Sequence, residues 1–248
     1  MATDHRSPSV PTNTEPTRST GSGPDLTSYR EIHLALLTAC DQLVAGLEAL
    51  PATGARPSTA KALRRWFTGY AGELGVHHHV EDDLFFPALA ARVPSYADYA
   101  PMLDADHLRM EELIAAVGVA LDGLVAGSAW IDARARAIAA AVALRDLLRR
   151  HLEAEDRDIL PMFERHFDAD EYAELDQKAL SGVPVRQALF TVPWFMATAT
   201  PEGAAHTWAN APLALKVVFR LTRRRHARLV RAAFGSSRTS ARSERGAS

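Results

Sequence analysis

Two stretches of the sequence resemble each other: HHHVEDDLFFP at residues 77–87 and HLEAEDRDILP at residues 151–161. Each has a glutamate four residues after its first histidine, and a proline ten residues after it. The copies lie 74 residues apart, and the same offset separates His33 from His107, each followed by leucine. A fixed offset shared by several positions predicts a duplicated helical hairpin, whose polar residues meet at one place.

Apolar residues recur at helical spacing in four segments of the chain. The first begins near Ser28, where Ser28-x-x-Glu31 has the pattern of a capping box. The second runs from residue 58 or 59 to about 92, with a bend at Pro87. The third follows residue 101 and ends at Gly127, and the fourth runs from about 132 to 167. Long helices with short connections predict an all-α, antiparallel up-down-up-down four-helix bundle.

The chain divides into four parts by composition. Residues 1–26 are rich in Ser, Thr, Pro and Gly, so we expect a disordered tail before the bundle at 27–167. Residues 168–234 are predicted to form a C-terminal helical extension. In it, Asp168-x-x-Glu171 caps a short helix to about Leu180, and a last helix runs from about 210 to 234. Residues 235–248 are interpreted as a second disordered tail.

Composition and charge limit the class of protein. Hydrophobic residues make up 47% of the chain, enough for a sizeable core, and the formal net charge of −2 gives no overall drive towards nucleic acid. A single cysteine, Cys40, excludes an internal disulfide and fits a reducing compartment. No signal-peptide pattern and no apolar run of transmembrane length occurs, so we expect a cytoplasmic protein.

The charge is unevenly distributed along the chain. From Pro212 to the end there are ten Lys and Arg residues but one acid, Glu244. Ordinary packing would place the last helix on the bundle with a solvated basic face. The alternative is that this basic helix binds an anionic surface, such as membrane lipid or nucleic acid.

Histidines and glutamates spaced four apart lie on one face of a helix. This spacing pairs residue 77 with 81, 107 with 111 and 151 with 155, whereas the first helix offers a lone histidine. In a bundle, seven side chains converge: His33, His77, Glu81, His107, Glu111, His151 and Glu155. Buried carboxylates need partners, and imidazole with carboxylate suits iron, manganese or zinc. Seven ligands exceed one tetrahedral zinc and predict two octahedral ions bridged by carboxylates.

Several alternatives stay open at this point. A single histidine or glutamate on a helix is more often solvated than a ligand, and a metal-free structural bundle would need none of the seven. At most one of the three consecutive histidines is expected to face inward. His78 with Asp82 offers the same spacing as the chosen pair, and Asp156 competes with Glu155. Glu111 has a neighbouring Glu112.

Over about residues 28–167 the chain resembles the hemerythrin-like, or HHE cation-binding, family. The resemblance rests on His33, His77-x-x-x-Glu81 with Phe86-Pro87, His107, and His151-x-x-x-Glu155-Asp156. It implies a centre of two non-haem iron ions, oxo- or hydroxo-bridged, that binds or senses O2, nitric oxide or peroxide. A di-iron enzyme with peroxidase-like or oxidase-like activity is the alternative function.

One position departs from the pattern of oxygen-carrying hemerythrins. Their third helix presents His-x-x-x-His, whereas here the second member is Glu111. A carboxylate in place of an imidazole adds negative charge and stabilises the ferric state. This departure argues against simple reversible O2 carriage.

Overall fold

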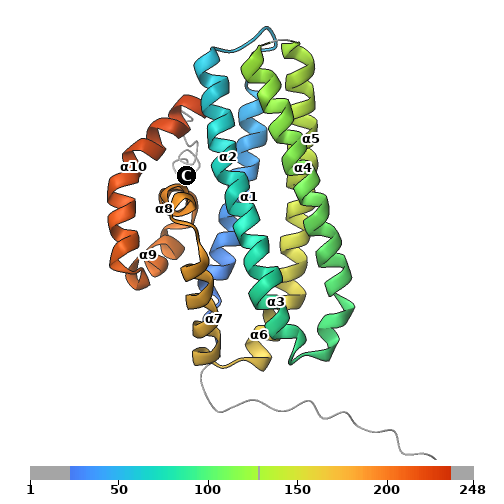
Figure 1. The fold of residues 1–248 in the computed structure, drawn as a ribbon, viewed down its shortest axis with the longest axis vertical. Helices are drawn as coiled ribbons and strands as arrows, with labels where there is room; N and C mark the ends of the chain where they lie inside the picture. Colours follow the sequence, from blue (N-terminus) through green and yellow to red (C-terminus); the bar gives the residue numbers. More distant parts are fainter. Residues whose placement is uncertain (1–22, 128, 236–248) are drawn as a thin grey trace, which may run out of the picture.

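The computed structural model describes residues 23–127 and 129–235, and every regular element within these ranges is helical (Figure 1). Four long helices lie side by side along the longest axis: α1 (Thr27–Glu48), α2 (Pro57–Val80), α4 (Ala100–Ala126) and α5 (Trp130–Ala154). Helix α5 packs against both α1 and α4, and α2 packs against α4. The predicted all-α class is thereby confirmed.

Each copy of the repeated motif interrupts its helix. A π-helical turn, η1 (Glu81–Phe85), separates α2 from the short helix α3 (Phe86–Ala90). The second copy likewise has η3 (Glu155–Ile159) followed by α6 (Leu160–His166). In η1 the Phe86 N–H donates to the Glu81 carbonyl five residues back, and the proline that follows has no N–H for the next bond. The predicted bend at Pro87 is therefore a wider turn that begins at the glutamate.

The predicted capping box at the start of the first helix does not form. The N-cap position of α1 is Leu26, and the helix end has no side-chain cap. Glu31 instead accepts hydrogen bonds from the backbone N (3.1 Å) and Oγ1 (2.7 Å) of Thr200, which itself caps a later helix. A distant contact that the sequence pattern does not reveal takes this glutamate away from its own helix.

Two other predicted helix ends are confirmed. The Asp168 side chain accepts from the Glu171 N–H (2.9 Å), and the Glu171 side chain accepts from the Asp168 N–H (3.1 Å). Helix α4 ends at Ala126, and Gly127 caps it with a φ of 73°, a left-handed conformation that favours glycine.

The C-terminal extension covers one side of the bundle (Figure 1). The extension consists of α7 (Ala169–Gly182), α8 (Val185–Thr198), α9 (Pro201–Asn210) and α10 (Leu213–Phe234). Within the bundle, the 3₁₀ helix η2 (Pro94–Asp98) connects α3 to α4. Helices α8 and α10 pack on α2, and α9 packs on α1. Trp194 and Ala233 of the extension belong to the same buried apolar cluster as Trp66 of α2.

A second apolar cluster lies around α3 and α6 and contains Phe85, Phe163 and Tyr172. Leu74 of α2 belongs to the first cluster, and Phe85 of η1 belongs to the second. The polar residues of the motif, 77–83, lie between them in the sequence. Along α2 and η1 the motif therefore lies between two apolar clusters.

Parts of the predictions fall on residues that the structure leaves undescribed. The tails predicted at 1–26 and 235–248 lie outside the described residues except at their inner ends, where Leu26 is buried. Among the helices of the described ranges, none has the length and apolar character needed to cross a membrane.

Candidate metal centre

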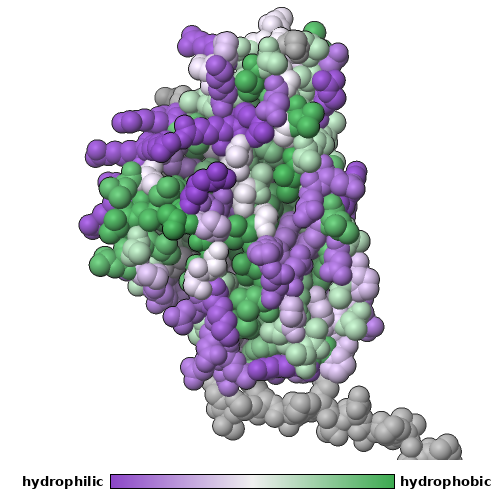
Figure 2. Space-filling view, in the orientation of Figure 1, coloured by the Kyte–Doolittle hydropathy of each residue, from purple (hydrophilic) through white to green (hydrophobic). Residues whose placement is uncertain are grey.

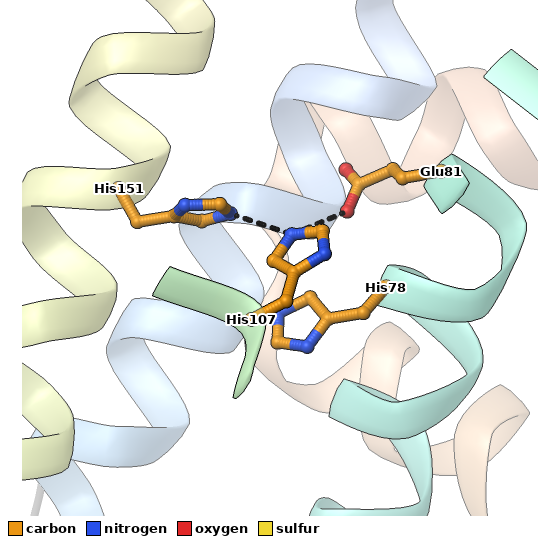
Figure 3. Close-up of side chains that lie close together, drawn as sticks. All are labelled: His78, Glu81, His107 and His151. Carbon is orange, nitrogen blue, oxygen red and sulfur yellow. Dashed lines mark hydrogen bonds and ion pairs between the residues drawn. The ribbon is translucent and has the colours of Figure 1, made fainter. Parts of the chain in front are cut away.

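Six of the seven predicted ligands are buried together inside the bundle. Their exposed fractions range from 0% to 9%, and they are His33, His77, Glu81, His107, His151 and Glu155. They come from α1, α2, η1, α4, α5 and η3, so that all four long helices contribute. Figure 3 shows four side chains turned towards one another, His78 from α2, Glu81 from η1, His107 from α4 and His151 from α5.

The donor atoms form two groups that share one glutamate. The three-histidine group consists of His78, His107, His151 and Glu81, and its donor atoms all lie within 4.8 Å of one another. The two-histidine group consists of His33, His77, Glu155 and Glu81, within the same distance. Glu155 also approaches the first group, since its Oε1 lies 3.2 Å from His151 Nε2. Both glutamates therefore stand between the two groups.

Many of these buried donors have no hydrogen-bond partner among the described residues. Nε2 of His33, His77 and His78 is unpartnered, as are both carboxylate oxygens of Glu155 and one of Glu81. His77 Nε2 lies 3.1 Å from Glu81 Oε1, a close approach that forms no hydrogen bond. Buried polar atoms are normally paired, and leaving several unpaired in one place is costly. Atoms that converge without bonding to each other fit a cation between them.

Carboxylates outside the groups bond to two of the imidazoles and lie near a third. Asp156 Oδ1 lies 2.9 Å from Nδ1 of His33, and Asp82 Oδ1 lies 2.9 Å from Nδ1 of His107. Asp106 Oδ2 lies 3.5 Å from Nδ1 of His151, a close approach that forms no hydrogen bond. A carboxylate on one ring nitrogen leaves the other free to face a metal, which is the usual environment of a metal-binding histidine. Asp82 and Asp156, the competing ligands in the sequence, thus occupy outer positions.

The buried environment sets the charge of these groups. Burial, followed by the neighbouring imidazoles, holds the pKa of His77 and of His78 well below the ordinary value, so both rings are neutral. Burial and then the nearby Glu155 raise the pKa of Glu81 well above its usual range. Burial opposes a negative charge on Glu155 too, but His151 beside it lowers its pKa. Burial opposes a positive charge on His151, but Glu155 and then Asp106 raise its pKa. Imidazoles and two facing carboxyls form a donor set suited to a divalent ion.

Tyr29 is part of the site, although the sequence analysis did not select it. Its hydroxyl donates a 2.5 Å hydrogen bond to Glu81 Oε1, and its ring packs edge-on against His33 at 4.8 Å between centroids. Burial and the charge of Glu81 raise its pKa well above the ordinary value, so the hydroxyl keeps its proton. The available signal was its position four residues before His33, on the same helix face.

Glu111 does not join the site, and His78 lies there in its place. Glu111 is exposed on α4, whereas His78 is buried, with its ring stacked 4.2 Å from that of His107. His77 turns instead towards His33, at 5.1 Å between ring centroids. Because α2 has different neighbours on two sides, two consecutive histidines both face inward. The third, His79, is exposed and pairs with Asp83 at 3.0 Å.

The donor set is therefore five imidazoles and two glutamates. The argument against reversible O2 carriage assumed that Glu111 adds a third carboxylate. Since Glu111 lies outside the site, that argument loses its basis.

Comparison with known proteins places the chain in a family. No curated protein and no solved structure matches it. The family model of the hemerythrin HHE cation binding domain matches residues 26–163, which includes all the buried donors and stops before the extension. The chain therefore belongs to the hemerythrin HHE cation-binding domain family.

Proposed function

We propose that this protein holds two non-haem iron ions, one in each group, and that the pair binds or senses O2, nitric oxide or peroxide. The observation that carries the proposal is the set of buried, unpartnered donor atoms gathered on both sides of Glu81. Imidazole and carboxylate together suit iron, and the one thiol, Cys40, is buried outside both groups. Membership of a cation-binding family supports the same proposal.

Each group of residues would hold one of the two ions. His78, His107 and His151 would hold one ion, and His33 and His77 the other, with Glu81 and Glu155 between the two. When bound, the iron pair supplies electrons and an open position for a small ligand. Asp156 and Asp82 hold the rings of His33 and His107 in position. The Tyr29 hydroxyl donates a hydrogen bond to Glu81.

The two groups are unequal, which favours one place for the ligand. The two-histidine group has fewer imidazoles, and its members His77 and Glu81 line a cavity that the three-histidine group reaches only through Glu81. A small ligand would therefore enter at the ion held by His33 and His77.

Iron content and absorption spectra test the proposal. After anaerobic loading with ferrous iron and removal of the excess, we expect two iron ions per chain and competition by manganese or zinc. Exposure to air, nitric oxide and peroxide in separate samples should change the spectrum in at least one. A chain that retains no iron, or an iron-loaded chain whose spectrum responds to none of the three, would overturn the proposal.

Peroxide consumption separates binding from turnover. Steady-state consumption by the iron-loaded protein would be compared with that of His77→Ala, which lacks one imidazole beside the cavity. Equal rates in the two proteins would remove the enzyme alternative.

The exposed face of α10 favours a second candidate function. We infer that this face binds an anionic lipid surface. Leu213, Val217 and Leu221 are 76%, 47% and 76% exposed and follow each other at intervals of one helical turn. Six exposed arginines lie along the same helix, and no ion pair within the described residues involves them: Arg220, Arg223, Arg224, Arg225, Arg228 and Arg231. Apolar side chains beside unpaired arginines suit a membrane interface more than nucleic acid.

Sedimentation with vesicles tests this second candidate. The protein should bind vesicles that contain phosphatidylglycerol and not vesicles of phosphatidylcholine alone. Replacing Arg224 and Arg228 by Ala should weaken binding several-fold, whereas Arg136→Ala on α5 should not. Preference for duplex DNA over the anionic vesicles would contradict the lipid assignment.

A further inference from the structure

The extension encloses a cavity of about 300 Å³ against α1 and α2. Its inner end is formed by Tyr29, His77 and Glu81, and Glu73 lies on the α2 wall. Helices α7, α8, α9 and α10 provide the other walls, including Ala179, Val192 and Leu215. The volume falls at the lower end of the range for small-molecule sites in proteins.

Loose packing of the extension does not explain this space. Elsewhere along the same interface, α8 lies so close to α2 that a side chain on Gly69 would collide with the Phe190 ring. Gly72 lies equally close to Gln187. Gln187 also donates a 3.0 Å hydrogen bond to the Gly69 carbonyl. The extension is tightly joined to α2 beside a space that it leaves open.

The walls are suited to an uncharged molecule. Most lining side chains are apolar, such as Ile32, Phe195 and Met196, and no lysine or arginine among the described residues lines the cavity. An anion would therefore find no opposite charge there. The acid on the α2 wall is already engaged, because Thr191 and Gln187 both donate hydrogen bonds to Glu73. A cation would have to break these bonds to pair with Glu73. Asp176 of α7 also lines the cavity, and burial, followed by the nearby Asp25, raises its pKa, which disfavours the charged carboxylate that a cation would need.

The cavity connects the metal centre with apolar surface. Pro212 and Leu215 line the outer part, and the neighbouring Leu213 is 76% exposed. Figure 2 shows apolar surface gathered over the lower part of α10 and over α9. A molecule entering beside α10 would meet mainly apolar side chains before it reached the edge of the two-histidine group.

We propose that the extension builds a binding site for an uncharged, mainly apolar organic molecule, which reaches the metal centre at His77 and Glu81. The role of this molecule as a reaction partner rests on the proposed iron function. The binding of this molecule does not rest on the iron function, because protein side chains form the cavity walls.

Fluorescent probe binding to the full chain tests the site. N-phenyl-1-naphthylamine, which is neutral, would be titrated into iron-loaded and metal-depleted protein. We expect saturable binding to both, and the anionic analogue 8-anilinonaphthalene-1-sulfonate should bind at least tenfold more weakly. Equal binding of the two probes, or stronger displacement by the cation 1-naphthylmethylammonium than by naphthalene, would overturn the assignment to an uncharged ligand.

Cavity-filling variants locate the probe. Ala179→Trp and, separately, Val192→Trp should weaken binding at least tenfold while circular dichroism stays unchanged. Ala173→Trp, on the exposed face of the same helix α7, should bind like the unaltered protein. Unchanged binding in a folded filling variant would show that the probe lies elsewhere and would refute the proposed site.

The absorption spectrum reports whether the probe reaches the centre. In iron-loaded protein, saturation with naphthalene should shift the iron absorption, and Ala179→Trp should abolish this shift. Probe binding without any shift would refute contact with the centre. Failure of the chain to take up iron would leave probe binding to metal-depleted protein as a separate result, so the two proposals fail independently.

Discussion

Single residues outside the two groups control how the imidazoles present their nitrogens. Asp82 holds His107 through Nδ1, whereas the adjacent Asp83 pairs with the exposed His79. We predict that Asp82→Asn weakens iron affinity about 10- to 100-fold, because the ring loses its carboxylate partner. Asp83→Asn is the matched control and should leave affinity unchanged. Competition with a chelator of known affinity measures both, and equal affinities would contradict the outer role of Asp82.

His78 and Glu111 test the composition of the site directly. His78→Ala removes one of three imidazoles from its group and should reduce the iron content towards one ion per chain. Glu111→Ala changes an exposed side chain and should retain the full iron content. Iron loss in Glu111→Ala with full retention in His78→Ala would favour the ligand set expected from the sequence over the one that the structure brings together.

At the scale of the element, the docking of α10 should depend on pH. His226 is 8% exposed and packs against Phe190, and burial lowers its pKa to about 4. In the undocked helix the ring would titrate near its ordinary pKa of about 6.5. The undocked state therefore binds the proton more strongly, and docking weakens as the pH falls from about 6.5 towards 4.

Hydrogen exchange measures this effect on α10. Between pH 7 and 5.5, after correction for intrinsic exchange rates, the protection of residues 213–234 should fall by about 1 kcal/mol. His226→Phe should remove the pH dependence, and His206→Gln, which alters a partly exposed histidine, should keep it. Protection that stays constant with pH in the unaltered protein would refute the prediction.

The sequence predicts elements well where one local pattern decides them. Apolar spacing gives the long helices, and Asp168 with Glu171 gives a helix start, because both depend on neighbours within one or two turns. Glu31 satisfies the same local pattern but bonds to Thr200, 169 residues away. The π-helical turns also escaped prediction, since they change the hydrogen bonding without changing the apolar pattern. The alternating directions of the four helices remain a prediction.

The sequence also identifies the part of the candidate site that a repeated pattern marks, and it misses the part that depends on contacts between helices. The 74-residue offset identifies six donors, because duplication repeats them. His78 has no such counterpart, since Leu152 occupies the corresponding position in the second copy. The outer aspartates and Tyr29 act through contacts between helices, which spacing within one helix does not report.

For the whole molecule, metal removal should lower thermal stability. Metal binding to the folded state stabilises it by about 2.7 kcal/mol when free metal is a hundredfold above its dissociation constant. For a chain of this size that corresponds to a thermal midpoint about 5–10 °C higher. Calorimetry with and without a chelator measures the difference. A chain in which both His77 and His107 are replaced by Ala should show none, and an equal difference in that variant would indicate a metal bound elsewhere.

One apolar cluster contains Trp66 of the bundle together with Trp194 and Ala233 of the extension, so we expect the bundle and the extension to unfold together. The segment shared with the family ends at residue 163, but helices that follow it cover some of its apolar side chains. We predict that a chain stopped after residue 167 is less soluble than the full chain and melts at a lower temperature. It would expose side chains that α8 and α10 normally cover. What is inherited as a module and what unfolds as one cooperative body are then different lengths of the same polypeptide.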